Sequence, residues 1–567
     1  MKQAAAIVLV LALALSMLAG CAKPAQSADG QAQAVQATER KQEARTDMAD
    51  PTLAAAMGGK KYDLSPHWLC EEKTTLTVST YDGVNSTYPA PSNDKWFWQA
   101  LEDYTNVHIE WDVSPIAGYD EIVNTRLSAG VDLSDIIMSN GARATKNAGD
   151  NGVFIDLAPY WDTCFPNTNA YFDTLDVDFQ SYIRNADGRI YALPNTLNPR
   201  EGHITFLYNT QWLEELGASV PQTLDEFTDL LYKMQQAGDL NHNGVDDELV
   251  LTSSSLSILL SVLGNAFNLE MYEGWDAFSA DAQGTVYSEY TTENMRECLR
   301  YLNQLYTDGI LDSEISYMSA DQLAEKIAND RVGCFVYYSG FAVGYGALTS
   351  AGQDDPLREC YTLGLPLASE WNGNEGYFVR RTLAYANTGA AITASCENPE
   401  LAAKWLDVLY ADPNILWIRC YGKEGETFQF NAESGALELL CGELGSWDAR
   451  YLGIGQIALP FIQTTEELLS DKLPYSWYLE EYAALRSAKW TDASVPKTNV
   501  FTDDEALLRD EVNSEVTSYW YEWRDRFVTG MASLDTDWDT YLGSINGVGM
   551  LQLTEVWQMV YDRTRGG

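Results

Sequence analysis

The sequence has few of the residues and motifs on which most enzymes depend. Only four of its 567 residues are histidines: His67, His108, His203 and His242. It contains no H-E-x-x-H zinc motif, no Walker phosphate loop and no G-x-S-x-G nucleophile turn. Acid–base chemistry would therefore rest on paired carboxylates, as in glycoside hydrolases. The chain has 82 Asp and Glu residues, so a glycan-degrading enzyme stays open, although surface solvation accounts for nearly all of them.

Basic residues are scarce as well. The chain has 36 Lys and Arg residues against 82 Asp and Glu residues, a formal net charge of -46 with a sequence pI near 4.2. A field of that sign repels polyanions, so we expect no nucleic-acid partner. Neutral solutes do not respond to it and stay open as ligands.

Cysteines are widely spaced, and no C-x-x-C pair is present. Eight follow Cys21 in the chain: Cys70, Cys164, Cys298, Cys334, Cys360, Cys396, Cys420 and Cys441. Eight cysteines allow 105 pairings, and sequence cannot choose among them. Disulfides and buried free thiols both stay open.

The apolar run at the N-terminus is too short to span a bilayer. Met1-Lys2 precede apolar residues 4–15, and small residues lead to Cys21, as in a secretory signal. Residues 18–21, Leu-Ala-Gly-Cys, resemble the lipobox of bacterial lipoproteins. We predict a signal peptide over 1–20, lipidation of Cys21 and a location on the extracellular face of the membrane. An ordinary secreted protein is the alternative.

No aromatic residue occurs between Ala22 and Gly59. Such a segment cannot form a core, so we predict a flexible linker over 21–61, with a partly helical stalk as the alternative. Elsewhere the chain has 17 Trp and 33 Tyr against 17 Phe. Rings with a polar group suit a carbohydrate site, because they stack on sugar faces, although most of them belong to the core.

The first ordered region predicts alternating strands and helices. Residues 74–80, 107–111 and 134–138 read as strands, and 95–105 and 120–129 as helices. This β-α-β-α-β order predicts a largely parallel sheet with ligands at the carboxyl ends of its strands.

About 500 residues after the linker exceed one core, so we expect two lobes. Extended runs at 190–194 and 204–208 suit a hinge. Lobe 1 is predicted over about 71–193 plus a later segment, and lobe 2 over about 205–335 plus most of the C-terminal part. Further expected elements are a strand at 361–366 and helices at 212–216, 224–237, 293–307, 320–329, 399–410, 503–527 and 537–561.

Residues 239–250 have the pattern of a calcium loop. Oxygen side chains occupy positions one, three, five and nine, and Gly244 occupies position six. Position twelve is Val250, so the usual bidentate Glu is missing and Glu248 would supply the last ligands. The predicted ligands are Asp239, Asn241, Asn243, the Val245 carbonyl, Asp247 and Glu248. A turn rich in Asn and Asp is the alternative.

Several short motifs in a fixed order carry a family resemblance. They include 190–194, 220–226, 305–312, 421–428 and 527–561, besides the lipobox and the Asp239 loop. In this order the chain resembles the extracellular solute-binding lipoproteins of bacterial ABC importers, in their carbohydrate-associated, Gram-positive form. Residues 208–213 depart from it, because relatives often carry a basic residue before the Trp-Leu pair.

The resemblance implies a two-lobed α/β fold of the periplasmic-binding-protein type with type II topology, hinge strands and a helix-rich C-terminal third. It further implies a monomer that closes on a sugar or oligosaccharide and delivers it to a permease, without turnover. In related proteins a loop like that at Asp239 holds calcium away from the ligand.

The ends of predicted strands and loops nominate the ligand contacts. The candidates are Tyr81, Asp82 and Asn140 in lobe 1, Asn195 and Arg200 beside the hinge, and Trp275, Tyr338 and Arg380 in lobe 2. For each ring, packing within its lobe is the alternative, and Asp82 and Arg380 could form structural ion pairs. Trp96, Trp98 and Trp538 are interpreted as core. A surface glycan-degrading enzyme and a peptide or signal binder remain the alternative functions.

Overall fold

The computed structural model describes most of the chain after the predicted linker. The described residues are 62–81, 90–138, 152–174, 183–184, 188–197, 204–271, 277–349, 358–380, 383–432, 437–440, 453–455, 462–463, 469, 472, 475–495 and 501–565. The predicted signal peptide, Cys21 and the linker lie outside them. Unit 1 comprises described residues of 1–198 and 383–476, and unit 2 those of 199–382 and 477–567. Among the described helices, none has the length and apolarity needed to cross a membrane.

Unit 1 is built on a six-stranded sheet with the order β15-β4-β12-β3-β1-β2. β1 (Thr74–Tyr81) is parallel to both β2 (Val107–Ser114) and β3 (Ile136–Met138), as the sequence predicted. β12 (Leu383–Ile392), which the sequence did not predict, is antiparallel to both β3 and β4 (Leu193–Leu197). β15 (Ile462–Gln463) pairs in parallel with β4. The sheet is therefore mixed.

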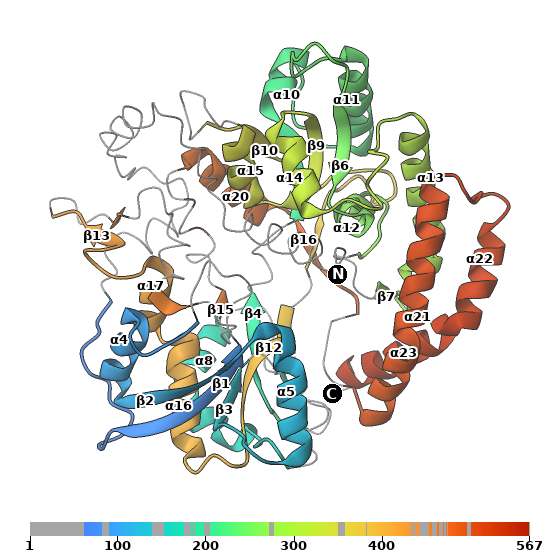
Figure 1. The fold of residues 1–567 in the computed structure, drawn as a ribbon. Helices are drawn as coiled ribbons and strands as arrows, with labels where there is room; N and C mark the ends of the chain where they lie inside the picture. Colours follow the sequence, from blue (N-terminus) through green and yellow to red (C-terminus); the bar gives the residue numbers. More distant parts are fainter. Residues whose placement is uncertain are drawn as a thin grey trace, which may run out of the picture. The chain divides into compact units, whose positions relative to one another are not determined.

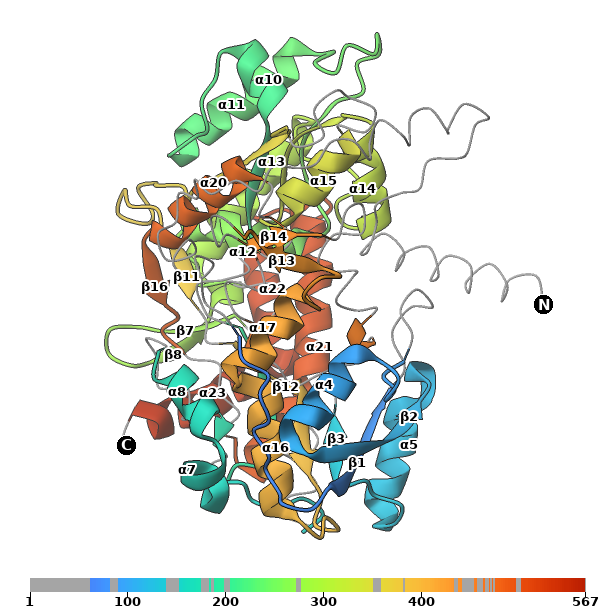
Figure 2. The same ribbon diagram turned by 90° about the vertical axis from the view of Figure 1, so that its left-hand side faces the viewer.

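Helices cover both faces of this sheet. Figures 1 and 2 show α5 (Ile116–Ala129) on one side and α16 (Pro399–Ala411) on the other. Alternating residues of β1 are buried, with Leu76 and Val78 at 1% and 0% exposure. The predicted helix at 95–105 is α4 (Trp96–Thr105), which buries Trp98 while Trp96 stays partly exposed.

Unit 2 contains a four-stranded sheet with the order β10-β5-β9-β6. β9 (Val332–Tyr338) is parallel to β6 (Leu249–Ser253) and antiparallel to β5 (Ile204–Asn209), which also pairs with β10 (Tyr361–Leu363). The helices predicted around it are present: α10 (Thr210–Leu216), α11 (Leu224–Ala237), α13 (Glu293–Thr307) and α14 (Ala320–Ala328).

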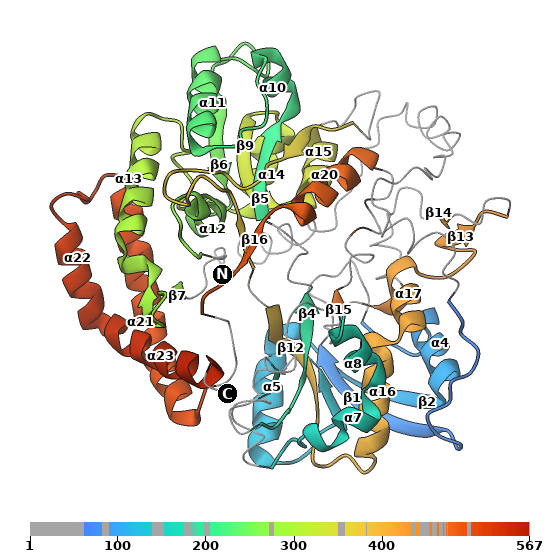
Figure 3. The same ribbon diagram turned by 180° about the vertical axis from the view of Figure 1, so that it is seen from behind.

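The last helices of unit 2 pack together and against α13 (Figure 3). α21 (Asp503–Val528) begins with a capping box formed by Thr502 and Glu505. The single helix predicted over 537–561 is wrong, because α22 (Trp538–Ile545) and α23 (Leu551–Arg565) are separate. A π-helical segment at Asn546–Met550 divides them, and Gly549 there has a φ of 134°, which a continuous helix excludes.

The seven described cysteines are all free thiols. Cys70 is partly exposed, and the other six are buried: Cys164, Cys298, Cys334, Cys360, Cys396 and Cys420. Cys21 and Cys441 lie outside the described residues. For these seven, the structure favours free thiols over disulfides. Burial raises the pKa of Cys396 to about 11, so this thiol stays protonated at neutral pH.

Candidate functional site

The carboxyl ends of β1 and β3 form the first candidate surface, in unit 1. Because these parallel strands are neighbours, their last residues, Tyr81 and Met138, lie at one edge of the sheet. The Tyr119 hydroxyl, from α5, donates to the carbonyls of Met138 at 2.8 Å and Ser79 at 3.2 Å. Tyr81 meets the Tyr119 ring edge-on with centroids 5.4 Å apart. The Tyr119 side chain of α5 thus bonds to the backbone at the ends of both β1 and β3.

Burial shapes the chemistry at this edge. It raises the pKa of Tyr119, whose hydroxyl is therefore a neutral donor. Thr80 has 0% exposure, and within the described part of the chain its hydroxyl has no hydrogen-bond partner. Neither residue was among the predicted contacts, because Tyr119 precedes the predicted helix and Thr80 has the pattern of an ordinary strand residue.

The end of β9 forms the second candidate surface, in unit 2. Tyr337 contacts Tyr338, Phe341 and Tyr345 with ring centroids 5.5, 4.7 and 5.8 Å away. Tyr338 also packs against the main core of unit 2. The next residue, Ser339, places its hydroxyl 3.3 Å from that of Tyr478. Tyr338, a predicted ligand contact, is therefore half-buried within an aromatic cluster of its own unit.

Of the remaining predicted contacts, four lie outside the described residues and two are described in their backbone alone. Asp82, Asn140, Arg200 and Trp275 lie outside the described residues. Asn195 belongs to β4, and Arg380 belongs to β11 (Phe378–Arg380), where it pairs with Asp492 of β16 (Trp490–Asp492). The side chains of Asn195 and Arg380 are not among those described. Of the predicted set, Tyr81 and Tyr338 alone have described side chains, and each lies at a strand end.

The Asp239 loop connects α11 to β6 and is closed by its own side chains. Asp239 Oδ2 accepts from the backbone N–H of Gly244 at 3.0 Å. Asn241 Oδ1 accepts from the Asn243 N–H at 3.0 Å, and Asn243 Oδ1 from the Val245 N–H at 2.7 Å. Gly244 has a φ of 83°, as the sharp turn requires.

Carboxylates on the far side of the loop meet backbone groups and one cation. Glu248 accepts from the backbone N–H groups of Asn241 at 3.2 Å and Asp247 at 3.0 Å. Asp247 accepts from Arg331 Nε at 2.8 Å through its Oδ2. Arg331 lies 84 positions further along the chain, so no local pattern pointed to it. Asp239 Oδ1 is buried and has no hydrogen-bond partner among the described residues.

The Asp239 Oδ1 atom indicates whether the loop could hold a cation. A buried carboxylate oxygen without a partner is costly unless a positive group satisfies it. The side-chain oxygens of Asn241 and Asn243 and the Val245 carbonyl are hard donors of the kind that calcium prefers. The types of donor therefore suit calcium, although the Arg331 guanidinium already pairs with Asp247. The described residues contain no cluster of three or more His, Cys, Asp or Glu side chains arranged for a metal.

Two α/β units, each built on a mixed sheet, are typical of the periplasmic-binding-protein fold with type II topology. The chain belongs to the bacterial extracellular solute-binding protein family, which it matches over residues 88–414. This confirms the family and the fold class expected from the sequence.

Two curated relatives show how far the similarity extends. The fructooligosaccharide ABC transporter substrate-binding protein FusA of Streptococcus pneumoniae is 24% identical over 547 residues, covering 91% of this chain and 96% of FusA. The lipoprotein LipO of Bacillus subtilis is 22% identical over 296 residues, covering 51% of this chain and 55% of LipO.

Solved structures share the fold at low identity. FusA in complex with kestose has a TM-score of 0.65 at 21% identity, covering 87% of this chain and 99% of FusA. An EF-hand mutant of FusA in complex with fructo-nystose gives the same values. The alginate-binding protein AlgQ2 without calcium ion has a TM-score of 0.65 at 18% identity, covering 88% of this chain and 100% of AlgQ2.

Proposed function

We propose that the chain is a lipid-anchored extracellular receptor that captures a carbohydrate, an oligosaccharide, and delivers it to the permease of an ABC transporter. The observation that carries this is the family membership together with similarity to FusA over nearly the whole of both chains. The receptor works as a monomer of two lobes, about 71–193 plus a later segment and about 205–335 plus most of the C-terminal part.

The proposed ligand contacts come from strand ends and the segments that follow them. They are Tyr81, Asp82, Asn140, Asn195, Arg200, Trp275, Tyr338 and Arg380. The rings described at the ends of β1 and β9 support this, because half-buried tyrosines offer a stacking face together with a hydroxyl. Closure of the two lobes on the sugar is the motion we propose.

In this proposal the protein binds the carbohydrate and does not cleave it. The curated relatives are a substrate-binding protein and a lipoprotein, and the sequence carries none of the catalytic motifs sought. A melting screen of the chain against neutral fructooligosaccharides, acidic uronate oligosaccharides and peptides tests it. We expect stabilisation by a neutral glycan that is recovered intact. Cleavage products, or stabilisation by peptides alone, would contradict it.

We propose that the Asp239 loop holds a structural calcium ion. Asp239, Asn241, Asn243, the Val245 carbonyl, Asp247 and Glu248 are the proposed ligands, and calcium would add positive charge to a loop of carboxylates. Support comes from the unpartnered buried Asp239 oxygen and from relatives whose structures concern calcium and an EF-hand. The ion would tie α11 to β6, and Arg331 would hold Asp247 in place.

We propose Cys21 as the lipid attachment point on the extracellular face, with residues 1–20 as the signal peptide and 21–61 as the linker. The similarity to the lipoprotein LipO supports the anchor. An anchor keeps the receptor close to its permease and so raises its effective concentration there.

A further inference from the structure

The first described residues, 62–73, run over the surface of unit 1 before β1 begins, and we call them the N-terminal strap. Two of their backbone N–H groups bond to the end of α4: His67 donates to the Tyr104 carbonyl at 2.8 Å, and Leu69 to the Thr105 carbonyl at 2.9 Å. The carbonyls at a helix C-terminus have no partner within the helix. The strap supplies that partner.

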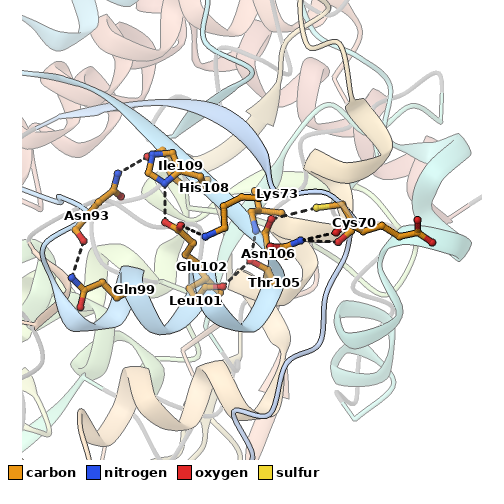
Figure 4. Close-up of polar contacts among 12 residues, drawn as sticks. Cys70, Lys73, Asn93, Gln99, Leu101, Glu102, Thr105, Asn106, His108 and Ile109 are labelled. Carbon is orange, nitrogen blue, oxygen red and sulfur yellow. Dashed lines mark hydrogen bonds and ion pairs between the residues drawn. The ribbon is translucent and has the colours of Figure 1, made fainter.

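The C-terminal half of the strap is fixed by side chains of the same helix end (Figure 4). Asn106 Nδ2 donates to the carbonyls of Cys70 at 3.0 Å and Glu71 at 3.3 Å, and Cys70 Sγ donates back to the Asn106 carbonyl at 3.4 Å. Lys73 Nζ lies 2.6 Å from Glu102 Oε1. Glu102 Oε2 meets His108 Nδ1 at 2.8 Å, which orients the carboxylate.

The N-terminal half is fixed to a second helix, α17 (Pro413–Tyr421). The Asp63 N–H donates to Asn414 Oδ1 at 2.8 Å. The Tyr62 hydroxyl donates to Glu424 Oε2 at 2.9 Å, and its ring stacks on Trp417 with centroids 6.3 Å apart. Tyr62 also meets Phe428 edge-on at 5.8 Å.

Each partner of the strap among the described residues belongs to unit 1. We propose that the strap is a docking segment that fastens the proposed membrane tether to unit 1, at α4 and α17. The role as a tether attachment rests on the proposed lipid anchor, whereas the packing of the strap on unit 1 does not depend on it.

Trp68 makes the strap testable, because its side chain is 60% exposed while its neighbours His67 and Leu69 are held through their backbone N–H groups. A protease that cuts after aromatic residues can therefore bind the Trp68 ring but must detach the strap to cleave. Cleavage then follows the population of the detached state.

Two substitutions should release the strap without unfolding unit 1. Asn106→Gly removes the amide that holds Cys70 and Glu71, and Gly keeps the left-handed φ of 60° at the end of α4. Tyr62→Ala removes the stacking on Trp417. Gln99→Ala is the matched control, because this side chain lies on α4 but contacts Asn93 and not the strap.

Chymotryptic cleavage after Trp68 is followed by mass spectrometry in the chain lacking its signal peptide. We expect Asn106→Gly and Tyr62→Ala each to accelerate it about ten-fold, with the Gln99→Ala rate and the melting temperatures unchanged. The proposal would be overturned by equal cleavage rates in the parent, the two release variants and the control. It would also be overturned if the parent were already cut after Trp68 as fast as the two release variants.

A separate arm tests the anchor on which its purpose rests. The lipidated full chain is bound to lipid vesicles and treated with trypsin, which should release it and, at the end of the digestion, leave Lys61 or Tyr62 as the new N-terminus after cutting behind Lys60 or Lys61. Failure of the full chain to bind vesicles would contradict the anchor alone. Release with a new N-terminus beyond residue 73 would contradict the strap.

Discussion

At the scale of single residues, Asp407 shows how one buried carboxylate holds two helices together. It lies on α16 with 2% exposure. Its Oδ1 accepts from the N–H and hydroxyl of Thr168 at 2.8 and 2.7 Å. Its Oδ2 accepts from the N–H and amide of Asn167 at 3.2 and 2.9 Å. These four bonds fix the start of α8 (Pro166–Phe172) on α16.

We expect Asp407→Asn to destabilise the protein by about 2 kcal/mol. The NH2 group of the new amide would face the N–H and side-chain donors of Asn167 or Thr168 instead of accepting hydrogen bonds from them. Urea unfolding of the variant measures the loss. Glu400→Gln is the control on the same helix, since Glu400 is exposed and, among the described residues, pairs with Lys404 alone. It should leave the urea midpoint nearly unchanged. Equal effects of the two substitutions would refute this role of Asp407.

Glu481 on α20 (Ser476–Ser487) predicts a pH dependence. Burial raises the pKa of Glu481 from 4.5 to about 8. The hydrogen bond from the Thr362 hydroxyl lowers this pKa, and the nearby charge of Glu359 raises it further. The Leu363 N–H donates to its Oε2 at 2.9 Å. Between pH 4.5 and about 8 the folded protein binds this proton more often than the unfolded chain does. Stability therefore falls as pH rises through that window.

Glu481→Gln should remove this fall and stabilise the protein above pH 8, by on the order of 1–2 kcal/mol. Melting temperatures between pH 5 and pH 9 provide the measurement. Glu480→Gln, one residue earlier and exposed, should keep the fall of the parent. A pH profile that Glu481→Gln leaves unchanged would show that this carboxyl is not the titrating group.

At the scale of elements, the break between α22 and α23 depends on one glycine. Gly549 has a φ of 134°, and a Cβ built there would lie 2.9 Å from Val512 Cβ. We expect Gly549→Ala to cost about 2 kcal/mol or more, measured by urea unfolding. At Gly547, two residues earlier, a Cβ meets no atom within 4 Å. Gly547→Ala should be neutral or slightly stabilising, and the reverse order would contradict this account of the break.

The Asp239 loop predicts a calcium-dependent melting temperature. Calcium at about one hundred times its Kd should stabilise the chain by about 2.7 kcal/mol, and chelator should remove the effect. Asp239→Asn should abolish the response. Asp281→Asn is the matched control, because Asp281 caps another turn through the Gln283 and Thr285 N–H groups. A calcium response that survives in Asp239→Asn would place the ion elsewhere.

Local signals explain which elements could be predicted. The helices at 224–237 and 293–307 were predicted with the bounds that the structure gives them. Thr223 and Thr292 cap them, and an apolar face repeats along each. β12 and β15 were missed because long-range pairing within the unit 1 sheet defines them. The break at Gly549 was missed because an apolar helical pattern continues on both sides of it.

At the scale of the whole molecule, the order of motifs along the chain identified the family, whereas the site residues were accessible only in part. Tyr81 and Tyr338 could be nominated because strand ends can be read from hydrophobic runs. Tyr119 and Arg331 could not, because helix packing brings Tyr119 to β1, and Arg331 meets the loop from a distant part of the chain. As ligand contacts, all eight nominated residues stay predictions: Tyr81, Asp82, Asn140, Asn195, Arg200, Trp275, Tyr338 and Arg380.

Net charge predicts which glycans suit the receptor. With a formal charge of -46, the chain repels acidic oligosaccharides at long range, whereas neutral ones are unaffected. Binding of a neutral glycan should therefore vary little between 50 mM and 500 mM salt in a calorimetric titration, while any binding of a uronate oligosaccharide should strengthen as salt rises. A strong salt dependence of neutral glycan binding would mean that charged groups dominate recognition.

Capture without turnover is the central claim, and equilibrium dialysis tests it most directly. The chain without its signal peptide is dialysed against the neutral oligosaccharide that stabilises it most, and both compartments are analysed by mass spectrometry after prolonged incubation. We expect one glycan retained per chain, with the mass and linkage of the starting compound. Shortened glycan products, or equal glycan concentrations on the two sides of the dialysis membrane, would contradict capture without turnover.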